Sequence, residues 1–473
     1  MPRQVKVVIG LLLVATFVMI LNETLMSVAL PRLMAVFDVG AGTAQWLTTG
    51  FLLTMAVVIP TTGLILRRFN TRAVFLAATS LFTAGTALAA AAPHFAVLVA
   101  GRMIQAGGTA VMLPLLTTTV ITFVPADRRG RTMGLISIVI AVAPAVGPAA
   151  SGLILSALSW HWLFLAVLPI ALLSLAAGAA LVRNITTPER VRCDLLSVVL
   201  STLAFGGLIF GLSSIGESAG GHAPLPLFVP LSVGGAALVL FVWRQLCLQR
   251  EDAALLDLRP LRIKPFVVGL TALLLSMGAL FGTLVLLPLY LQNVRGLSTL
   301  RTGLLLLPGG LAMGMIAPVV GRLYDRFGPR LLVIPGTSVV ALALGAMSTL
   351  DAGTPVSRII LIHVLQCLGL GCVLTPVMTS ALGSLSPGLY AHGSAVLNTL
   401  QQLAGAAGTS LFVTVMNTVG AEHGRSGAGS AAQVAGIQEA FLWGVGMAVL
   451  ALVASLFIRR TAVPATGQGH APH

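Results

Sequence analysis

Two ionisable side chains lie deep within apolar stretches of this sequence, where charged groups are uncommon. Glu23 is the only carboxylate well inside such a stretch, and Arg102 is the only basic residue inside one. Charged side chains within a membrane usually face a cavity or a partner, because exposing them to lipid is costly. A partly desolvated carboxyl group at position 23 is suited to take up and release protons. We therefore expect Glu23 to couple protons or contact a substrate, and Arg102 to act as a gate or proton relay.

Both residues also have a structural interpretation. Glu23 would then be a static partner of Arg102 or of nearby hydroxyl groups, and Arg102 would bind backbone carbonyl groups. His363 occupies the position that corresponds to Arg102 in the second half of the chain. Histidine can titrate near neutral pH, but a single histidine near a helix end is more often structural.

Uncharged polar residues accompany these charges. Thr16, Glu23 and Ser27 share one face of a helix, with Asn22 close by, because residues seven and eleven apart lie on the same side. A late apolar stretch carries an asparagine and two glutamines, which suggests the wall of a cavity. The side chains expected to line a substrate cavity are Thr16, Met19, Asn22, Gln45, Gln105, Gln292, Asn398 and Gln402.

Proline and glycine cluster in the fifth apolar stretch, where Gly147 and Pro148 follow Pro144 and precede Gly152. Proline removes a helical hydrogen bond and kinks the helix, and glycine allows a neighbouring helix to approach closely. The cluster indicates either a conformational role for Gly147 and Pro148 or simple helix packing.

The composition excludes several classes of protein. Of 473 residues, 57% are hydrophobic and 8% are charged, and the mean hydropathy is +1.00, so neither a soluble enzyme nor a disordered chain fits. The net charge of +14 comes from short loops, which argues against nucleic acid as a partner. Neither Lys6 nor Lys264 belongs to a phosphate-binding loop, which excludes an ATP-driven pump on this chain. The Gly216–Gly220 match to the G-x-S-x-G nucleophile pattern falls in a loop between membrane helices, where the required strand-to-helix turn is not expected. The sequence also shows no cluster of metal ligands. We expect neither enzymatic activity, nor a metal, nor a bound cofactor.

Fourteen apolar stretches are long enough to cross the hydrocarbon core, which takes about 20 residues. Stretches of this length must form helices, because lipid cannot satisfy exposed backbone groups. Six stretches precede a pair at about 195–213 and 226–243, and six follow it. The flanking twelve begin near Val7, Gln45, Ala73, Phe95, Thr132, Trp162, Phe266, Leu300, Leu331, Ile359, His392 and Gln438.

Loop charges predict the orientation of these helices. One set of alternate loops, together with the two termini, carries 21 basic residues, and the opposite set carries five. Because basic loops remain in the cytoplasm, both termini are expected there.

An internal repeat relates the two sets of six helices. Gly63–Phe69 and Gly321–Phe327 share a G-x-x-x-x-R-F pattern 258 residues apart, and the first helices of the two sets begin near residues 7 and 266. Arg102-x-x-Gln105-x-x-Gly108 pairs in the same way with His363-x-x-Gln366-x-x-Gly369. Parallel repeats of this kind are one of the known transporter architectures.

Several segments resemble the 14-helix drug:proton antiporter branch of the major facilitator superfamily, along nearly the whole chain. The matching segments are Leu21–Thr24 with Val28–Pro31, Gln45-Trp46, Arg102-x-x-Gln105, Gly147-Pro148-x-x-Ser151-Gly152, Trp160–Phe164 with Pro169, and Gly321–Arg330. The resemblance implies the fold of that superfamily and export driven by the proton gradient, with gating roles for Gly147, Pro148, Gly321, Asp325 and Arg326.

The sequence also departs from this pattern. The first-helix aspartate of the family is Asn22 here, with Glu23 beside it, and the first loop motif has Arg67 and Asn70 in place of aspartate and glycine. The lincomycin-resistance-like subgroup shows similar departures, so the chain is most similar to that subgroup.

The expected organisation is an all-α membrane protein of two six-helix bundles. Residues 1–182 form the first bundle, 183–264 a linker with two extra helices, 265–460 the second bundle, and 461–473 a disordered cytoplasmic tail. We expect a monomer in the cytoplasmic membrane of a bacterium that exchanges protons for small amphipathic drugs or antibiotics by alternating access. The alternatives are a proton-coupled metabolite symporter, a dedicated exporter of one endogenous compound and, least favoured, a non-transporting membrane sensor.

Overall fold

The structure, a computed structural model of the whole chain, describes residues 3–39, 41–44, 46–182, 184, 194–218, 228–251, 254–424 and 429–458. All regular elements in these residues are helices, as the composition predicted. Gln45, most of the loop after residue 182 and the expected tail at 461–473 lie outside the described residues.

Thirteen helical segments in the described part of the chain are long and apolar enough to cross a membrane. The remaining expected span coincides with α7, a helix of 32 residues in which the described apolar stretch, Val142–Ala157, is shorter. The observed membrane helices thus follow the predicted order.

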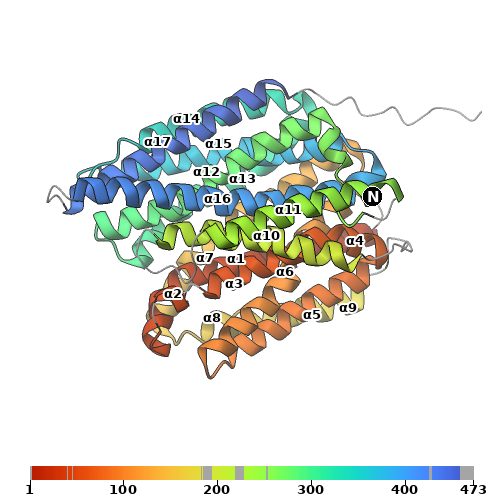
Figure 1. Cartoon of the computed structure of the whole chain (residues 1–473), viewed down its shortest axis with the longest axis horizontal. Coiled ribbons are helices and arrows are strands. Elements are labelled where there is room, and N and C mark those ends of the chain that lie inside the picture. The colour runs from red at the N-terminus through yellow and green to blue at the C-terminus, as the bar shows by residue number, and fades with distance from the viewer. Residues whose placement is uncertain are drawn as a thin grey trace, which may run out of the picture.

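The first group of helices lies in the lower part of Figure 1. It comprises α1 (Arg3–Phe37), α2 (Ala41–Ala44), α3 (Trp46–Val58), η1 (Ile59–Thr61), α4 (Thr62–Arg68), α5 (Thr71–Ala90), α6 (Phe95–Phe123), α7 (Ala126–Ala157), α8 (Trp162–Leu165) and α9 (Leu168–Leu181). The 3-10 turn η1 contains Pro60 and interrupts the second span, because proline cannot donate a helical hydrogen bond.

The second group lies in the upper part of Figure 1. It comprises α12 (Lys264–Leu289), η4 (Tyr290–Val294, a π-helical turn), α13 (Thr299–Phe327), α14 (Arg330–Met347), α15 (Val356–Gly383), η5 (Pro387–Leu389), α16 (Tyr390–Gly424) and α17 (Gly429–Leu456). The starts of α5 and α6, Thr71 and Phe95, recur at Arg330 and Val356 in α14 and α15, with nearly the offset of the sequence repeat.

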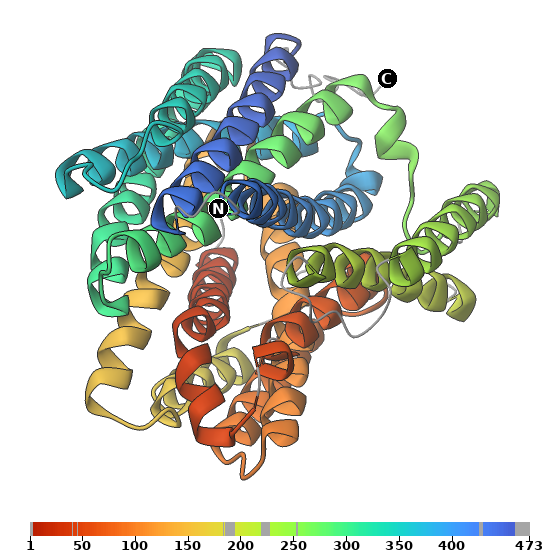
Figure 2. The same ribbon diagram turned by 60° about the vertical axis from the view of Figure 1, so that its left-hand side comes forward.

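Two inserted helices lie on the flank of the molecule, between the two groups (Figure 2). They are α10 (Leu195–Ser218) and α11 (Phe228–Leu248), followed by the short turns η2 (Gln249–Glu251) and η3 (Arg259–Arg262). Gly207 and Gly234 hold the pair close together, since a Cβ at Gly207 would lie 2.9 Å from the Cα of Gly234. Helix α10 also packs against α3 of the first group and α16 of the second.

The two groups meet along two seams. At one seam α7 packs against α13, and glycines allow the close approach: a Cβ at Gly134 would lie 2.8 Å from the carbonyl oxygen of Ala317, and one at Gly303 would lie 3.0 Å from the backbone nitrogen of Ala149. At the other seam α16 packs against α4 and α6. This second seam includes the end of the molecule at which α4 ends with Arg67 and Arg68, which we call the basic end.

Candidate functional site

Arg102 is buried in the first group, with 1% of its surface exposed. Its guanidinium donates hydrogen bonds to Asn22 Oδ1 (2.8 Å) and Gln105 Oε1 (3.0 Å). The guanidinium carbon also lies 4.3 Å from the centre of the Phe51 ring, a cation–π contact. The intramembrane cation is therefore held by neutral partners from α1, α3 and α6.

Glycines bring α6 close enough to α5 to form this cluster. A Cβ at Gly85 would lie 2.6 Å from the backbone nitrogen of Gln105, and one at Gly101 would lie 2.9 Å from that of Ala89. This approach also lets Gln105 Nε2 donate to Thr86 Oγ1 at 2.8 Å. The network therefore runs from Asn22 through Arg102 and Gln105 to Thr86.

Two donors in this cluster remain unused. Asn22 Nδ2 and Arg102 Nε are buried, and no described residue accepts a hydrogen bond from either of them. Unsatisfied buried donors cost free energy, so a further acceptor beside this cluster would be stabilised. A carboxylate is an acceptor of this kind.

Glu23 is half-buried beside this cluster, and no described residue forms a hydrogen bond with its carboxyl group. The guanidinium of Arg102 is close enough to act on it electrostatically. The sequence presented Glu23 or backbone carbonyl groups as partners of Arg102, whereas the side chain bound to it from α1 is that of Asn22. Glu23 is left without a fixed partner among the described residues.

The other predicted cavity residues of α1 face elsewhere. Met19 lines a small apolar cavity inside the first group, together with Thr79, Phe82 and Ser174. Thr16 is buried and donates its hydroxyl to the carbonyl oxygen of Leu12 at 2.6 Å. Neither residue shares a described hydrogen bond with Arg102.

The predicted cavity residues of the second group lie at different depths. Gln402 Nε2 contacts Met55 Sδ at 3.8 Å and so connects α16 to α3. Asn398 is buried and donates to the carbonyl oxygen of Ser394 within its own helix at 2.7 Å. Gln292 is half-buried in the π-helical turn η4.

A pocket between the two groups was not identified from the sequence. Both groups contribute to its walls, through α7 on one side and α12, α13, α15 and α16 on the other. Its lining is Met133, Ile136, Ile140, Leu273, Met277, Met313, Leu374, Thr375, Met378, Thr379 and Gln401. The Thr379 hydroxyl is buried and has no hydrogen-bond partner among the described residues. The cavity is small in this conformation, about 20 Å³, and its apolar walls with few polar groups have the composition of sites for small organic molecules.

Four methionines, each from a different helix, dominate this pocket. Methionine is flexible and polarisable, so it adapts to ligands of different shape. Hydropathy could not reveal them, because in an apolar helix methionine resembles any other hydrophobic residue. The three polar residues of the lining, Thr375, Thr379 and Gln401, would have pointed to the pocket only with the helix packing known.

The predicted conformational residues lie at close contacts or helix ends. A Cβ at Gly147 would overlap the Thr24 hydroxyl, so α7 touches α1 there. Pro148 adjoins the contact of α7 with Gly303.

The loop-motif residues lie where α13 ends, at the basic end. Arg326 lies over the ring of Phe327 at 5.1 Å. Asp325 is half-buried, and Gly321 is buried. Helix α13 stops at Gly328, whose φ of 81° favours glycine.

The second half contains a related cluster with different chemistry. Gln366 Nε2 donates to Thr283 Oγ1 at 2.8 Å, as Gln105 does to Thr86. His363, at the place that corresponds to Arg102, is buried with its Nε2 3.7 Å from Cys367 Sγ. The described residues contain no group of three or more histidine, cysteine, aspartate or glutamate side chains that could hold a metal.

Comparison with known proteins gives consistent matches along the chain. The sequence profile of the Major Facilitator Superfamily matches residues 12–409. The lincomycin resistance protein LmrB of Listeria monocytogenes is 43% identical over 459 residues, 96% of each chain. A multidrug resistance protein B homolog of Mycobacterium tuberculosis is 30% identical over 86% of this chain and 75% of its own. The human organic anion transporter MFSD10 (TETRAN) has a similar fold, with a TM-score of 0.65 at 17% identity, over 95% of this chain and all of that one.

Proposed function

We propose that this chain, which belongs to the Major Facilitator Superfamily, exports small amphipathic drugs or antibiotics in exchange for protons. The observation that carries the proposal is the methionine-lined pocket, which both groups of helices enclose. Relatives named for lincomycin resistance and multidrug resistance support export of such compounds. A dedicated exporter would need a pocket with more fixed polar contacts.

The lining of the pocket favours an amphipathic substrate. Met133, Met277, Met313 and Met378 offer a soft apolar surface, and the charged residues of the described chain are absent from it. Thr379 and Gln401 provide hydrogen bonds for one polar edge of the substrate. Such a site tolerates variation in the apolar part and selects weakly at the polar edge.

Glu23 is the group we assign to proton coupling. When protonated it carries no charge that a partner must balance, and when ionised it is an acceptor for the two unused donors of Asn22 and Arg102. Protonation of Glu23 would therefore break the hydrogen bonds that its ionised carboxylate makes with Asn22 and Arg102, and so change the contact between α1 and α6. We propose that this change biases alternating access, with the proton gradient as the energy source and no bound cofactor. Gly147, Pro148, Gly321, Asp325 and Arg326 would act at the contacts that change.

The excess of basic loop residues favours a protein oriented with its basic end and both termini in the cytoplasm. Its bacterial relatives favour a bacterial cytoplasmic membrane. We propose that residues 1–182 and 265–460 move as two bundles, that the unit is a monomer, and that its ligands are protons, a small molecule and lipid.

The test is survival of a pump-deficient bacterial host on lipophilic antibiotics and cationic dyes. Wild type should protect, Glu23→Gln should not, and Glu422→Gln should protect as wild type does, because Glu422 is exposed at the end of α16. Membrane amounts of the three proteins must match. Protection by Glu23→Gln would reject the coupling assignment. Proton-dependent uptake without protection would replace export by import.

A further inference from the structure

Thr24, the residue after Glu23, lies against the turn of α7 that contains Pro144. Its hydroxyl oxygen is 3.5 Å from the carbonyl oxygen of Ala143. On the other side of the proline, a Cβ at Gly147 would lie only 2.8 Å from the Cβ of Thr24, so the two helices are in contact there as well. Residues 143 and 147 are the acceptor and the donor of one regular helical hydrogen bond. Thr24 therefore touches both ends of the turn that contains the proline.

Two prolines weaken α7 around this turn. Pro144 has no N–H, so the carbonyl group of Ile140 lacks its helical donor, and Pro148 removes a second such bond in the same way. A helix that lacks these bonds changes its bend at lower cost than a regular helix. Thr24 is fixed to α1, because its hydroxyl group donates to the carbonyl oxygen of Leu21 at 3.0 Å. The weak turn of α7 therefore rests on a side chain that moves with α1.

Beyond this turn α7 continues into the methionine-lined pocket. Ile140, Ile136 and Met133 are the residues of α7 that line it. A helix rises about 1.5 Å per residue, so Ile140 lies about 10 Å along α7 from Gly147. None of the described lining residues comes from α1. A drug in the pocket and a proton on Glu23 thus occupy separate places, and α7 connects the two.

We propose that Thr24 is a positioning residue, which transmits the protonation of Glu23 to the drug pocket by setting the bend of α7 at Pro144. Ionised Glu23 is attracted to the unused donors of Asn22 and Arg102, and α1 shifts with it. The turn of α7 follows through its contact with Thr24, and this displaces the wall that α7 gives to the pocket. Proton and drug are thereby coupled without contact between them. This role of Thr24 rests on the proposed proton coupling by Glu23.

The direction of the effect follows from the charges around Glu23. Arg102 of α6 acts on it electrostatically, and the other charged residues of the helices that pack against α1 lie in the first two turns of α5 and α7, at the basic end. In the described arrangement Glu23 has no hydrogen bond to a described residue, which is the arrangement that its neutral form can keep. Glu23→Gln should therefore hold the pocket in its described form, and ionised Glu23 should favour a changed one.

A cysteine in the pocket makes this change measurable without a drug. Met133→Cys is introduced into a chain whose four native cysteines are replaced, and its reaction with N-ethylmaleimide is followed in membranes at pH 8. The described cavity of about 20 Å³ has room for one or two water molecules only, so the reaction reports departures from this form. The chain with Glu23 should react roughly tenfold faster than the chain with Glu23→Gln, the effect of one hydrogen bond to a charged group.

Changes at Thr24 then test the transmission. Thr24→Ala should abolish the difference between the chains with and without Glu23→Gln, because the contact with the weak turn is lost. Thr24→Ser keeps the hydroxyl group and should preserve most of the difference. Thr16→Ala is the matched control and should preserve all of it. Thr16 is also a threonine of α1 with a hydrogen bond inside the helix, to the carbonyl oxygen of Leu12 at 2.6 Å, and it lies about two turns before Thr24.

Three outcomes would overturn the role of Thr24. If the tenfold difference survives Thr24→Ala, the signal takes another route, although Glu23 remains the coupling residue. If Thr16→Ala also abolishes the difference, the packing of α1 in general is responsible. If Glu23→Gln has no effect on the otherwise unchanged chain, protonation of Glu23 does not reach the pocket, and survival of the host on drugs decides separately whether the protein exports them.

Discussion

Truncation of two adjacent residues of α1, Asn22 and Glu23, should give different results: loss of stability at the first and loss of drug protection without loss of stability at the second. Asn22→Ala removes the acceptor 2.8 Å from the Arg102 guanidinium, whereas Glu23→Ala removes a side chain without a hydrogen bond to any described residue. Both changes introduce the same small, helix-favouring side chain at adjoining positions. The pair therefore separates structural support from coupling.

The size of the difference follows from the contacts. A hydrogen bond to a charged group contributes about 1.5–3 kcal/mol, and Asn22 is fully buried, so truncation adds about 1 kcal/mol for the cavity. Asn22→Ala should therefore lower the free energy of unfolding by about 2.5–4 kcal/mol. Glu23→Ala should change it by less than about 1 kcal/mol, because the side chain is half-buried.

The measurement is unfolding of the purified proteins by titration with a denaturing detergent, run beside drug protection in cells. Asn22→Ala should shift the unfolding midpoint clearly downward. Glu23→Ala should unfold like wild type yet fail to protect the host. If Glu23→Ala is destabilised as much as Asn22→Ala, Glu23 is a structural partner of Arg102, and the argument for proton coupling from its unpaired state is refuted.

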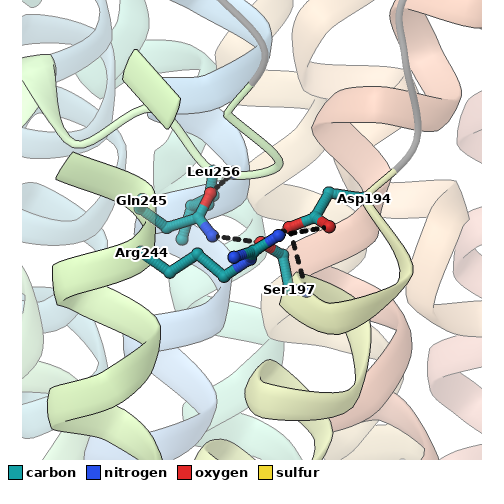
Figure 3. A network of polar contacts seen from close by, with 5 residues as sticks. All are labelled: Asp194, Ser197, Arg244, Gln245 and Leu256. Atoms are coloured by element: carbon teal, nitrogen blue, oxygen red, sulfur yellow. Dashed lines mark hydrogen bonds and ion pairs between the residues drawn. The ribbon is translucent and has the colours of Figure 1, made fainter. Parts of the chain in front are cut away.

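Three further changes test other parts of the structure. Gly147→Ala places a Cβ on the Thr24 hydroxyl and should abolish transport while protein still reaches the membrane, as quantitative blotting beside an efflux assay will show. Thr379→Val removes a hydroxyl group from the pocket lining. Protection against compounds with a polar edge should fall by about fivefold, the effect of one lost hydrogen bond, and protection against lipophilic cations should change little. Dose–response curves for each compound measure the difference. Arg244 of α11 donates to both carboxylate oxygens of Asp194, just before α10, and lowers the pKa of Asp194 (Figure 3). The pair therefore stabilises the protein at pH values above the ordinary aspartate pKa of about 4, and this stabilisation is lost as the pH falls toward the lowered pKa. Asp194→Asn should be less stable than wild type by a constant amount from pH 8 to 5, and the melting curves of the two proteins should converge only below about pH 4.

Helix positions were predictable because length and hydropathy are strong signals. The stretches expected near Phe95 and Trp162 begin as α6 and α8 at those same residues. Helix α1 runs beyond its apolar stretch, from Arg3 to Phe37, because polar residues at membrane surfaces continue a helix without lipid contact. Hydropathy distinguishes residues inside the membrane from those outside it, and this distinction is enough to place each membrane helix along the chain.

The partner of Arg102 was not predictable to the same degree. The sequence isolates Arg102 and the pair Asn22-Glu23 as polar groups in apolar stretches, but neighbouring residues point about 100° apart on a helix. Which of the two faces α6 depends on how α1 is rotated about its own axis where it packs against α6. That is a property of packing between helices, and hydropathy does not contain it.

The contacts of His392, the third residue of α16, lie even further from sequence patterns. Its partner Asp257 contributes a backbone N–H, which every residue except proline has. Its partner Arg67 stands where related transporters have aspartate, so the pattern alone suggested a lost contact. The structure shows a different contact in its place.

The position of α10 makes the two sides of the molecule unequal toward the bilayer. The repeat alone would give two similar flanks, each with a seam between the halves. Here α10 packs against α3 and α16, beside the second seam, whereas in the part of the chain that the structure describes neither inserted helix lies along the seam of α7 and α13 (Figure 2). A compound dissolved in the lipid therefore meets an inserted helix on one flank and the contact between α7 and α13 on the other. Access from the bilayer to the interface between the two groups is thus more direct on the second flank.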